Sequence, residues 1–400
     1  YSSAASDVYK RQDMYEVYLK KGEERRILSG HSWVYANEVQ EIKGKDKNGS
    51  LATVFTHDKK YIGKGYINHL SKILVRIFIR NDDIDDEEFY KKRIKAANDM
   101  RIDLGFDDAY RMVFAESDDL PALIIDKYAD VLVMECLSLG ISQRKDLIVK
   151  CLVDLFHPKG IFEKSEAQVL KKEGVPETQG VLYGEVPEKI VISENGVKMY
   201  VDVRNGQKTG YFLDQKENRM AIRRYAKDKT VLDCFSNSGG FSINAATVAK
   251  EVTAVDISEI QVKAVLENAA LNGFKNVNAV CADVFEYLRL KKRENRKYGV
   301  VVLDPPAFTK SAAEVGDAYR GYKDINVLGL KLVEKGGYLV TSSCSHYMTP
   351  TLFQKMIVES AKESGRRVRL VEIRTQSPDH PSLLSMDETQ YLKFYVLRVD

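Results

Sequence analysis

Three acidic residues stand at the ends of three consecutive strand-like segments in the second half of the chain. Asp233 closes VLD, Asp256 closes VTAVD 23 residues later, and Asp283 closes VNAVCAD. Because the carboxyl ends of parallel strands meet at one edge of a sheet, we expect the three carboxylates to converge there. An acid on the second strand can accept both hydroxyls of a ribose, and Asp283 could accept from an adenine amine. The pattern predicts a nucleoside-binding site.

The turn after Asp233 narrows the ligand class. The segment LDCFSNSGGFS leads into a helix but has only part of the GxGxxG spacing, since Phe235 and Asn237 fill positions often held by glycine. No Lys-Ser/Thr phosphate-binding element accompanies this turn. The expected ligand is therefore adenosine with a tail that lacks phosphate, such as S-adenosylmethionine, rather than a dinucleotide.

Two later strand-like segments end in a second pair of reactive residues, Asp304 and Cys344. VVLDPPAF places Asp304 before two prolines that stiffen the turn, and YLVTSSC ends at Cys344. A rigid carboxylate suits the amino edge of a flipped-out base, and Phe308 could stack on the face of that base. A thiolate that adds to C6 of a pyrimidine makes C5 able to accept a methyl group, so the pair predicts a nucleophilic cysteine. A buried, inert cysteine is the alternative.

The other candidate residues carry weaker signals. Four further cysteines, at positions 136, 151, 234 and 281, lie within apolar runs, and we expect them to pack in the interior. No CxxC pair occurs, so no metal site is expected, and the odd count without paired spacing favours a reducing, cytoplasmic compartment. His346 could act as a base, although a loop histidine without function is the simpler interpretation. Lys208 and Lys216 receive no role.

Three domains are expected to position these residues. Strand-like runs between Gly-, Asn- and Lys-rich turns predict a small β-barrel over residues 14–82, and a mixed α/β domain is expected over 83–195. From 196 to 400, near-continuous apolar strands alternate with amphipathic helices, which predicts a Rossmann-like α/β domain with a parallel sheet. Residues 1–13 lack this periodicity and are expected to be a disordered tail or a sequence artefact.

Several elements are predicted within these domains. Residues 88–105 have helical periodicity, strands are expected near 112–115, 122–126, 131–137 and 160–164, and a helix is expected at about 142–156. The segment DQKENRMAIRRYA is expected to form one helix, and VRLVEI and YLKFYVLRV could pair as an antiparallel edge.

Charge is unevenly distributed along the chain. Residues 14–80 contain 13 Lys or Arg and 7 Asp or Glu, a balance of +6, whereas the whole chain carries +3. A basic module joined to a near-neutral body is typical of nucleic-acid binders, although a solvated surface would look the same. No apolar run approaches the roughly 20 residues that cross a bilayer, so no membrane association is expected.

Several segments together resemble the bacterial 23S rRNA cytosine-C5 methyltransferase family, which combines an N-terminal PUA domain with a class I methyltransferase domain. They are GHSWVYANEV, DLPALIIDKYAD, GQKTGYFLDQKENR, LDCFSNSGGFS, DPPAFTKS, SSCS and DETQYLK. The resemblance implies that Cys344 and Asp304 are catalytic, that S-adenosylmethionine is the cofactor and that 23S rRNA is the partner; a homodimer is left open. It also implies that the donor is held by Asp233, Phe235, Ser236, Gly239, Asp256, Ile257, Asp283, Val284 and Gln215.

Three other functions stay open at this point. A C5-uracil methyltransferase also uses a cysteine after a DPP-type loop, but many of these enzymes carry iron–sulfur cysteines that this sequence lacks. An adenine or guanine N-methyltransferase would not need Cys344 and typically has Asn at the position of Asp304. A catalytically silent RNA-binding assembly factor would need no methyl donor.

Overall fold

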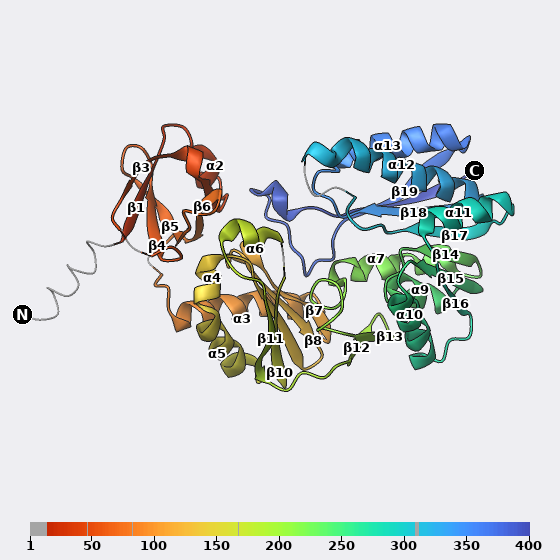
Figure 1. Ribbon diagram of the computed structural model, residues 1–400, viewed down its shortest axis with the longest axis horizontal. Helices are drawn as coiled ribbons and strands as arrows, with labels where there is room; N and C mark the ends of the chain where they lie inside the picture. The colour runs from red at the N-terminus through yellow and green to blue at the C-terminus, as the bar shows by residue number, and fades with distance from the viewer. Residues whose placement is uncertain (1–13, 46, 82, 167, 309–311) are drawn as a thin grey trace, which may run out of the picture. The chain divides into compact units, whose positions relative to one another are not determined.

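The computed structural model describes residues 14–400 except residues 46, 82, 167 and 309–311 (Figure 1). The tail expected at 1–13 lies outside the described residues. The chain forms two compact units, and each unit is built from three separate segments of the chain. The first contains the chain up to Ile190 with Val201–Phe212 and Pro378–Thr389, and the second contains Val191–Tyr200, Leu213–Ser377 and Gln390–Asp400. The domain limits at residues 82 and 195 stay predictions.

The first unit begins with a six-stranded sheet around one apolar core, in the order β2-β6-β5-β4-β1-β3. Buried and half-buried side chains alternate along β1 and β4, as expected for strands with one face on a core. The strand-like runs predicted over this region are confirmed. The segment SWVYANEV contains two strands on either side of a short 3₁₀ turn, and helix α2 (Glu24–Leu28) was not anticipated. The strands are β1 (Tyr15–Leu19), β2 (Trp33–Tyr35), β3 (Val39–Lys43), β4 (Leu51–Phe55), β5 (Tyr61–Ile67) and β6 (Ile73–Ile79).

A second sheet of the first unit has five strands in the order β11-β10-β9-β8-β7. The predicted helix and strands are confirmed, whereas α6 and β11 were not anticipated and the second predicted helix is divided in two. The strands are β7 (Ala109–Phe114), β8 (Leu123–Tyr128), β9 (Val131–Cys136), β10 (Gly160–Ser165) and β11 (Thr178–Gly184). The helices are α3 (Glu87–Asp103), α4 (Leu139–Gln143), α5 (Lys145–Phe156) and α6 (Gln168–Glu173).

Buried ion pairs connect the six-stranded sheet to two elements beside the five-stranded sheet, the 3₁₀ turn that follows β7 and helix α6. Arg76 of β6 contacts Glu116 at 3.3 Å and Glu173 at 2.9 Å, and all three side chains are buried. Trp33 donates a hydrogen bond of 2.8 Å to Glu116. Removing Arg76 would leave two buried carboxylates without this cation, and breaking a buried pair typically costs about 3–5 kcal/mol, so the packing of these elements depends on Arg76.

Two distant segments are anchored to the five-stranded sheet by buried polar groups. Asp126 of β8 accepts two hydrogen bonds of 2.8 Å from Arg111 and one of 2.6 Å from Thr209 in segment 201–212. Asp379 in segment 378–389 accepts from the main-chain N–H of Arg111 at 2.8 Å. These bonds explain why both segments belong to the first unit although they lie far along the chain.

The second unit is built on a seven-stranded sheet in the order β16-β15-β14-β17-β18-β20-β19. The strands are β14 (Thr230–Cys234), β15 (Glu251–Asp256), β16 (Val277–Cys281), β17 (Tyr298–Leu303), β18 (Val333–Ser343), β19 (Val368–Arg374) and β20 (Lys393–Val399). β14 to β18 are parallel, and β20 is antiparallel to both of its neighbours. The predicted pairing of the last two strands is therefore confirmed, with β20 inside the sheet and β19 at its edge.

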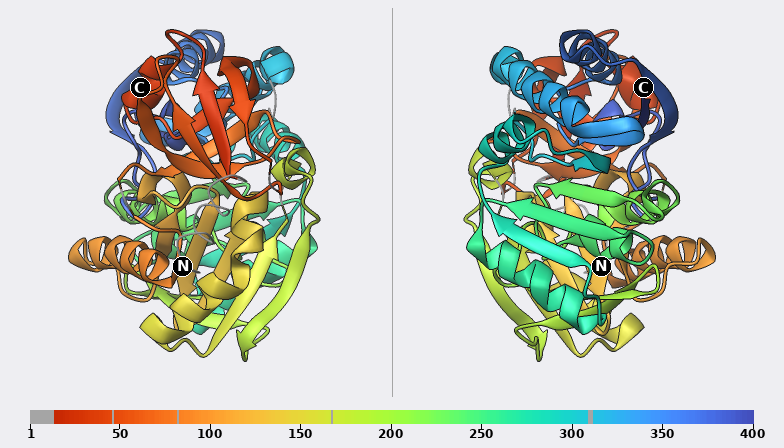
Figure 2. Two further views of the ribbon diagram at one scale, coloured as in Figure 1. Left: turned by 90° about the vertical axis from the view of Figure 1, so that its left-hand side faces the viewer. Right: turned by 90° about the vertical axis from the view of Figure 1, so that its right-hand side faces the viewer.

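Helices cover both faces of this sheet (Figures 1 and 2). Helices α11 (Val284–Arg293), α12 (Val315–Leu332) and α13 (Pro350–Ser364) pack together on one face, and α9 (Gly240–Ala246) and α10 (Glu259–Leu271) pack on the other. Strand order reverses between β14 and β17, so a ligand is expected at the carboxyl ends of these strands. This arrangement is the predicted Rossmann-like fold.

Two further parts of the second unit precede the sheet. β12 (Ile190–Glu194) and β13 (Val197–Val201) form a two-stranded sheet. The single helix predicted over DQKENRMAIRRYA is instead a 3₁₀ turn (Leu213–Gln215) followed by α7 (Lys216–Ala221) and α8 (Arg223–Ala226). Among the helices described in both units, none is long and apolar enough to cross a membrane.

Candidate active site

Asp304 and Cys344 lie at the carboxyl ends of two neighbouring parallel strands. Leu303 at the end of β17 pairs with Thr341 of β18, so Asp304 lies beside Ser342. The Ser342 hydroxyl donates a hydrogen bond of 2.5 Å to Oδ1 of Asp304. Cys344 follows the last residue of β18 and is partly exposed. The strand register therefore brings the predicted carboxylate and the predicted nucleophile to the same edge of the sheet.

Gln215 also bonds to Oδ1 of Asp304. Its Nε2 donates a hydrogen bond of 3.0 Å to Oδ1 of Asp304, and its Oε1 accepts one of 2.6 Å from Asn218. Asn218 in turn accepts a bond of 3.0 Å from Arg374. Because Asn218 occupies the carbonyl side of the Gln215 amide, the amino side must face Asp304. The sequence pointed to a donor contact for Gln215, and its bond to Asp304 is an additional finding.

Tyr322 and Lys393 flank Cys344 and were not singled out from the sequence. Ser343 donates a bond of 3.0 Å to the hydroxyl of Tyr322 on α12, and burial raises the pKa of that hydroxyl to about 12. Lys393, the first residue of β20, donates a bond of 2.5 Å to the carbonyl of Ser345. The one signal in the sequence was a lysine at the start of a mainly apolar strand.

The other four cysteines differ from Cys344 in their surroundings. Cys136, Cys151 and Cys234 are buried as expected, and burial raises the pKa of Cys136 to about 12 and that of Cys151 to about 11. The expectation that Cys281 is packed in the interior is wrong, because it ends β16 at the edge of the sheet and is exposed. Cys344 is thus the partly exposed thiol beside the strand-ending carboxylate.

The first strand of the sheet carries a buried carboxylate with an unsatisfied oxygen. Asp233 lies one residue before the end of β14, where its Oδ2 accepts a bond of 2.6 Å from Ser242. Its Oδ1 and the hydroxyl of Ser236 are buried without a partner among the described residues. Burial raises the pKa of Asp233 to about 7, with a smaller contribution from Asp304. Buried polar atoms without partners are rare, so these two atoms fit a polar ligand in this turn.

The turn between β14 and α9 has an unusual backbone. Phe235, Asn237 and Gly239 have φ values of 60°, 48° and 89°, which lie in the left-handed region. A Cβ at position 239 would lie 3.1 Å from a methyl carbon of Val265, so this position also favours glycine. Left-handed non-glycine residues cost of order 1–3 kcal/mol and persist mainly at functional sites. The strain supports a binding role for this turn.

Asp256 connects the turn that follows β14 to the turn that follows β15. It is the last residue of β15, and its Oδ2 accepts a bond of 2.9 Å from the N–H of Asn237, while its Oδ1 accepts one of 2.9 Å from the N–H of Ser258. A carboxylate oxygen has two lone pairs, so these bonds leave capacity for ribose hydroxyls. Its neighbour Ile257 is 71% exposed, which is unusual for isoleucine and suits an apolar contact with a flat ligand.

Asp283, the third of the acidic residues, also has a structural role. Asp283 follows β16 and caps α11, because its Oδ1 accepts a bond of 3.0 Å from the N–H of Glu286. Its side chain is exposed, whereas that of Val284 is buried in the core. Val284 can therefore contact a ligand at this edge only through its main chain. The three acids end adjacent strands β14, β15 and β16, as the sequence predicted.

Phe308 lies within an aromatic group close to the strand ends. Its ring centroid is 4.7 Å from that of Tyr322, 6.3 Å from that of Phe285 and 6.4 Å from that of Phe235. The side chain is half-buried. Phe235, a predicted donor-site residue, and Phe308, a predicted base-stacking residue, therefore share one cluster. Thr309, Lys310 and Ser311 of the DPPAFTKS segment lie outside the described residues.

The remaining candidates lie apart from these groups. His346 is exposed, and its ring contacts Tyr347. Lys216 is buried at the start of α7 in the second unit, whereas Lys208 is exposed in the first unit, where its ammonium lies 4.6 Å from the ring of Phe212. Among the residues that the structure describes, no group of His, Cys, Asp or Glu side chains could hold a metal ion.

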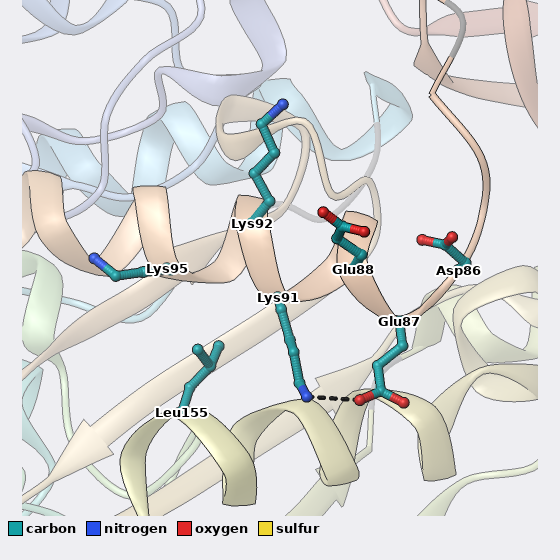
Figure 3. A pocket seen from close by; sticks show the side chains of 7 residues that line it. All are labelled: Asp86, Glu87, Glu88, Lys91, Lys92, Lys95 and Leu155. Carbon is teal, nitrogen blue, oxygen red and sulfur yellow. Dashed lines mark hydrogen bonds and ion pairs between the residues drawn. The ribbon is translucent and has the colours of Figure 1, made fainter.

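A hollow of about 550 Å³ lies between α3 and α5 in the first unit (Figure 3). Its lining is mostly charged, and Lys91 pairs with Glu87 at 2.6 Å and with Asp154 at 2.6 Å. It contains none of the residues predicted to act in chemistry. Exposed pairs of this kind contribute little to stability and are expected on a solvated helix surface.

Comparisons with known proteins agree with the fold. Residues 17–80 match the family described as a PUA-like domain, and residues 149–398 match the family described as S-adenosylmethionine-dependent methyltransferase. The chain is 40% identical over 391 residues to the ribosomal RNA large subunit methyltransferase I of Aeromonas salmonicida, covering 96% of this chain and 98% of that protein. The protein of the same name from Vibrio vulnificus is 39% identical over 392 residues, covering 96% and 99%.

Solved structures share the fold over nearly the whole chain. A putative S-adenosylmethionine-dependent methyltransferase from Streptococcus mutans has a TM-score of 0.82 at 22% identity, covering 96% of this chain and all of that one. Another putative methyltransferase, crystallised with SAH, has a TM-score of 0.83 at 22% identity with the same coverage. The chain is an S-adenosylmethionine-dependent methyltransferase and belongs to the family of ribosomal RNA large subunit methyltransferase I.

Proposed function

We propose that this enzyme methylates carbon 5 of a cytosine in the 23S RNA of the large ribosomal subunit, through a covalent bond between Cys344 and C6 of the base. The relatives named above act, by their names, on ribosomal RNA of the large subunit. The observation that carries the choice of chemistry is the pairing of β17 with β18, which places a carboxylate and a partly exposed thiol at neighbouring strand ends.

Asp304 is the group that recognises the base. Cytosine presents an amino donor at N4 where uracil presents an oxygen, so a carboxylate acceptor favours cytosine. Hydrogen bonds from Gln215 and Ser342 to Oδ1 fix the direction of the carboxylate. The proposed contact of this acceptor with N4 therefore favours cytosine over the uracil alternative.

Cys344 is the nucleophile. Its thiolate forms a bond to C6, and the electrons of the C5–C6 double bond move to C5, which becomes nucleophilic. S-adenosylmethionine, when bound, supplies the methyl group that C5 takes. A base then removes the proton from C5, the double bond re-forms, and the C6–S bond breaks to release the thiolate. The identity of that base stays open.

The three loops at the ends of β14, β15 and β16 are the proposed donor site. Asp233 and Ser236 contribute buried atoms that need a partner, and the backbone of residues 235–239 brings main-chain groups to the ligand. Asp256 is assigned to the ribose, Ile257 to the face of the adenine, and Asp283 and the main chain of Val284 to its edge. Phe235 and Gly239 shape the turn, and Gln215 borders it through Asp304.

The basic PUA-like domain is the proposed RNA-binding module. Arg26 and Arg76 are engaged in ion pairs with Glu38, Glu116 and Glu173, so they are structural. Lys21, Arg25 and Lys72 are exposed and have no ion pair within the described part of the chain. Cations of this kind are available to RNA phosphates.

The proposal is tested by mapping methylated nucleotides in 23S RNA from cells with and without the gene, using mass spectrometry of nuclease fragments. We expect one 5-methylcytidine to disappear without the gene and to return with the wild-type enzyme. Loss of a 5-methyluridine would contradict the choice of base, and loss of an N-methylated purine would contradict the C5 chemistry. An unchanged pattern, together with no transfer in vitro, would favour a non-catalytic assembly factor.

A further inference from the structure

Lys393 occupies an unusual place for a lysine. It is the first residue of β20, a strand whose other side chains are mainly apolar, and it pairs in register with Ser343 of β18. Only 6% of its surface is exposed. A lysine so deeply buried is rare without a compensating charge. Its neighbour across the two strands is the residue that immediately precedes Cys344.

The ammonium group of Lys393 is held against the backbone that follows Cys344. Nζ donates one hydrogen bond of 2.5 Å to the carbonyl of Ser345 and another of 2.7 Å to the carbonyl of Tyr391. These bonds use two of the three donors of an ammonium group. They also fix the direction of the lysine side chain toward the loop that carries the thiol.

Among the described residues, no carboxylate compensates this charge. Within the described residues Lys393 has no ion pair, and burial lowers its pKa to about 8, while the nearby Cys344 thiolate acts in the opposite direction. Electrostatic attraction is mutual, so a cation that is favoured by a thiolate favours that thiolate to the same extent. Cys344 is the anion that this buried cation can balance.

We propose that Lys393 is a positioning residue that keeps the Cys344 thiol ionised and directed outward before RNA binds. The assignment rests on the proposed function, because it gives the lysine a role only if the thiolate is the nucleophile. A thiol that is already ionised can attack C6 directly, because it has no proton to transfer to a general base or to solvent first.

Other titratable groups around Cys344 do not supply this charge. Tyr322 faces it from α12 as a neutral hydroxyl, since burial raises the pKa of Tyr322 to about 12. Asp304 faces it from the end of β17 and would oppose ionisation of the thiol as an anion. His346 follows in the same loop and is exposed. Lys393 is therefore the buried cation among the described groups that surround the thiol.

The test measures the rate of iodoacetamide alkylation against pH, with peptide mass spectrometry to report Cys344 and Cys281 separately in the full-length protein. Cys281 is exposed at the edge of the sheet and serves as an internal reference. We expect the pH at which alkylation of Cys344 reaches half its maximal rate, its midpoint, to lie below that of Cys281. Lys393→Gln, which keeps hydrogen-bond donors but removes the charge, should raise the Cys344 midpoint by about one pH unit and leave that of Cys281 in place.

Two further variants separate charge from structure. Lys393→Arg keeps the charge and should retain the low midpoint, whereas Lys393→Met, which has neither charge nor donor, should behave like Lys393→Gln. An unchanged Cys344 midpoint in folded Lys393→Gln would overturn the proposal. Lys393 would then have only the structural role of donating hydrogen bonds to two carbonyls. Should the variants not fold, a wild-type midpoint for Cys344 at or above that of Cys281 overturns it equally.

Alkylation needs neither RNA nor methyl donor, so this result is independent of the proposed reaction. A shifted midpoint in an enzyme that forms no adduct with cytosine would support the role of Lys393 and reject the covalent mechanism. Adduct formation together with an unchanged pH midpoint for Cys344 alkylation in Lys393→Gln would support the covalent mechanism and reject the proposed role of Lys393.

Discussion

The hydroxyl of Ser342 lies 2.5 Å from Oδ1 of Asp304, and Ser342, near the end of β18, precedes Cys344 by two residues. The bond links the end of β17 to the end of β18, where the proposed base-reading carboxylate and the proposed nucleophile follow directly. Because parallel strands in a buried sheet have a fixed register, the fold sets where both groups leave the sheet.

The amide of Gln215 should matter for rate through Asp304. Gln215→Ala removes one hydrogen bond to a carboxylate, worth roughly 1.5–3 kcal/mol, so kcat/KM should fall by about 10- to 100-fold. Gln215→Glu places a second anion beside Asp304 and should be more damaging. Steady-state methylation of an rRNA fragment measures both.

Donor titration by calorimetry distinguishes the two roles of Gln215. If it acts only on Asp304, the affinity for S-adenosylmethionine should stay within about twofold of wild type. A large loss of donor affinity with an unchanged rate at saturating donor would favour the donor contact inferred from the sequence and reject the positioning role.

Donor binding should depend on pH through Asp233. S-adenosylmethionine carries positive groups, which favour an ionised carboxylate, whereas burial raises the pKa of Asp233 in the free protein to about 7. Below that pH a proton must leave on binding, so affinity should fall as pH decreases, by up to about tenfold per unit, and should level off above it. Calorimetry across about pH 5.5 to 8 measures this.

The matched control for this effect is Asp233→Asn, which cannot ionise. The affinity of this variant for S-adenosylmethionine should be weak, and it should not show the fall with decreasing pH that is expected for the wild type. The same slope in both proteins would assign the titration to the ligand or to another group, and would remove Asp233 from the donor site.

Asp256 should contribute to donor affinity twice. Asp256→Ala removes the ribose acceptor and also the acceptor for the N–H groups of Asn237 and Ser258, so we expect an affinity loss of at least about tenfold. Glu259→Ala removes an exposed acid three residues away and should have no effect. Equal calorimetric affinities for folded Asp256→Ala and wild type would refute the assignment.

Much of this site could be predicted from local patterns. The strands before Asp233 and Asp304 are recognisable because burial on both faces leaves a continuous apolar run in the sequence. Cys344 could be selected for the same reason, since it follows such a strand. The β-strands of the N-terminal domain were equally visible from alternating burial and turn residues.

Contacts across long sequence distances could not be predicted in this way. The bonds of Gln215 to Asp304 and of Lys393 to Ser345 depend on strand register and loop direction, which no local pattern encodes. Cys281 was expected inside because its run is apolar, but whether a strand lies at the edge of a sheet depends on strand order. The membership of segments 201–212 and 378–389 in the first unit follows from Asp126 and Asp379.

Cations of the PUA-like domain should control the salt dependence of RNA binding. Replacing Lys21, Arg25 and Lys72 with glutamine should weaken binding and should reduce the slope of log K against log salt by roughly 0.7–0.9 for each lost phosphate contact. Donor affinity should not change. Filter binding at several salt concentrations gives the slope.

The control for this experiment removes the same number of charges elsewhere. Lys91, Lys95 and Lys150 are paired with carboxylates on α3 and α5, and their replacement by glutamine should leave the slope unchanged. Equal slopes for all three proteins would show that the charge balance of residues 14–80 is a solvated surface without a role in RNA binding.

Trapping on RNA that contains 5-fluorocytidine tests the proposed covalent bond from Cys344 to C6 of the base. Fluorine at C5 cannot leave as a proton does, so the wild-type enzyme with donor should give an enzyme–RNA band that survives denaturing electrophoresis. Cys344→Ala should give no band, while Cys281→Ala, which removes the exposed thiol at the edge of the sheet, should give it in full. A persistent band in Cys344→Ala would reject this nucleophile, and full methylation by Cys344→Ala would contradict covalent catalysis itself.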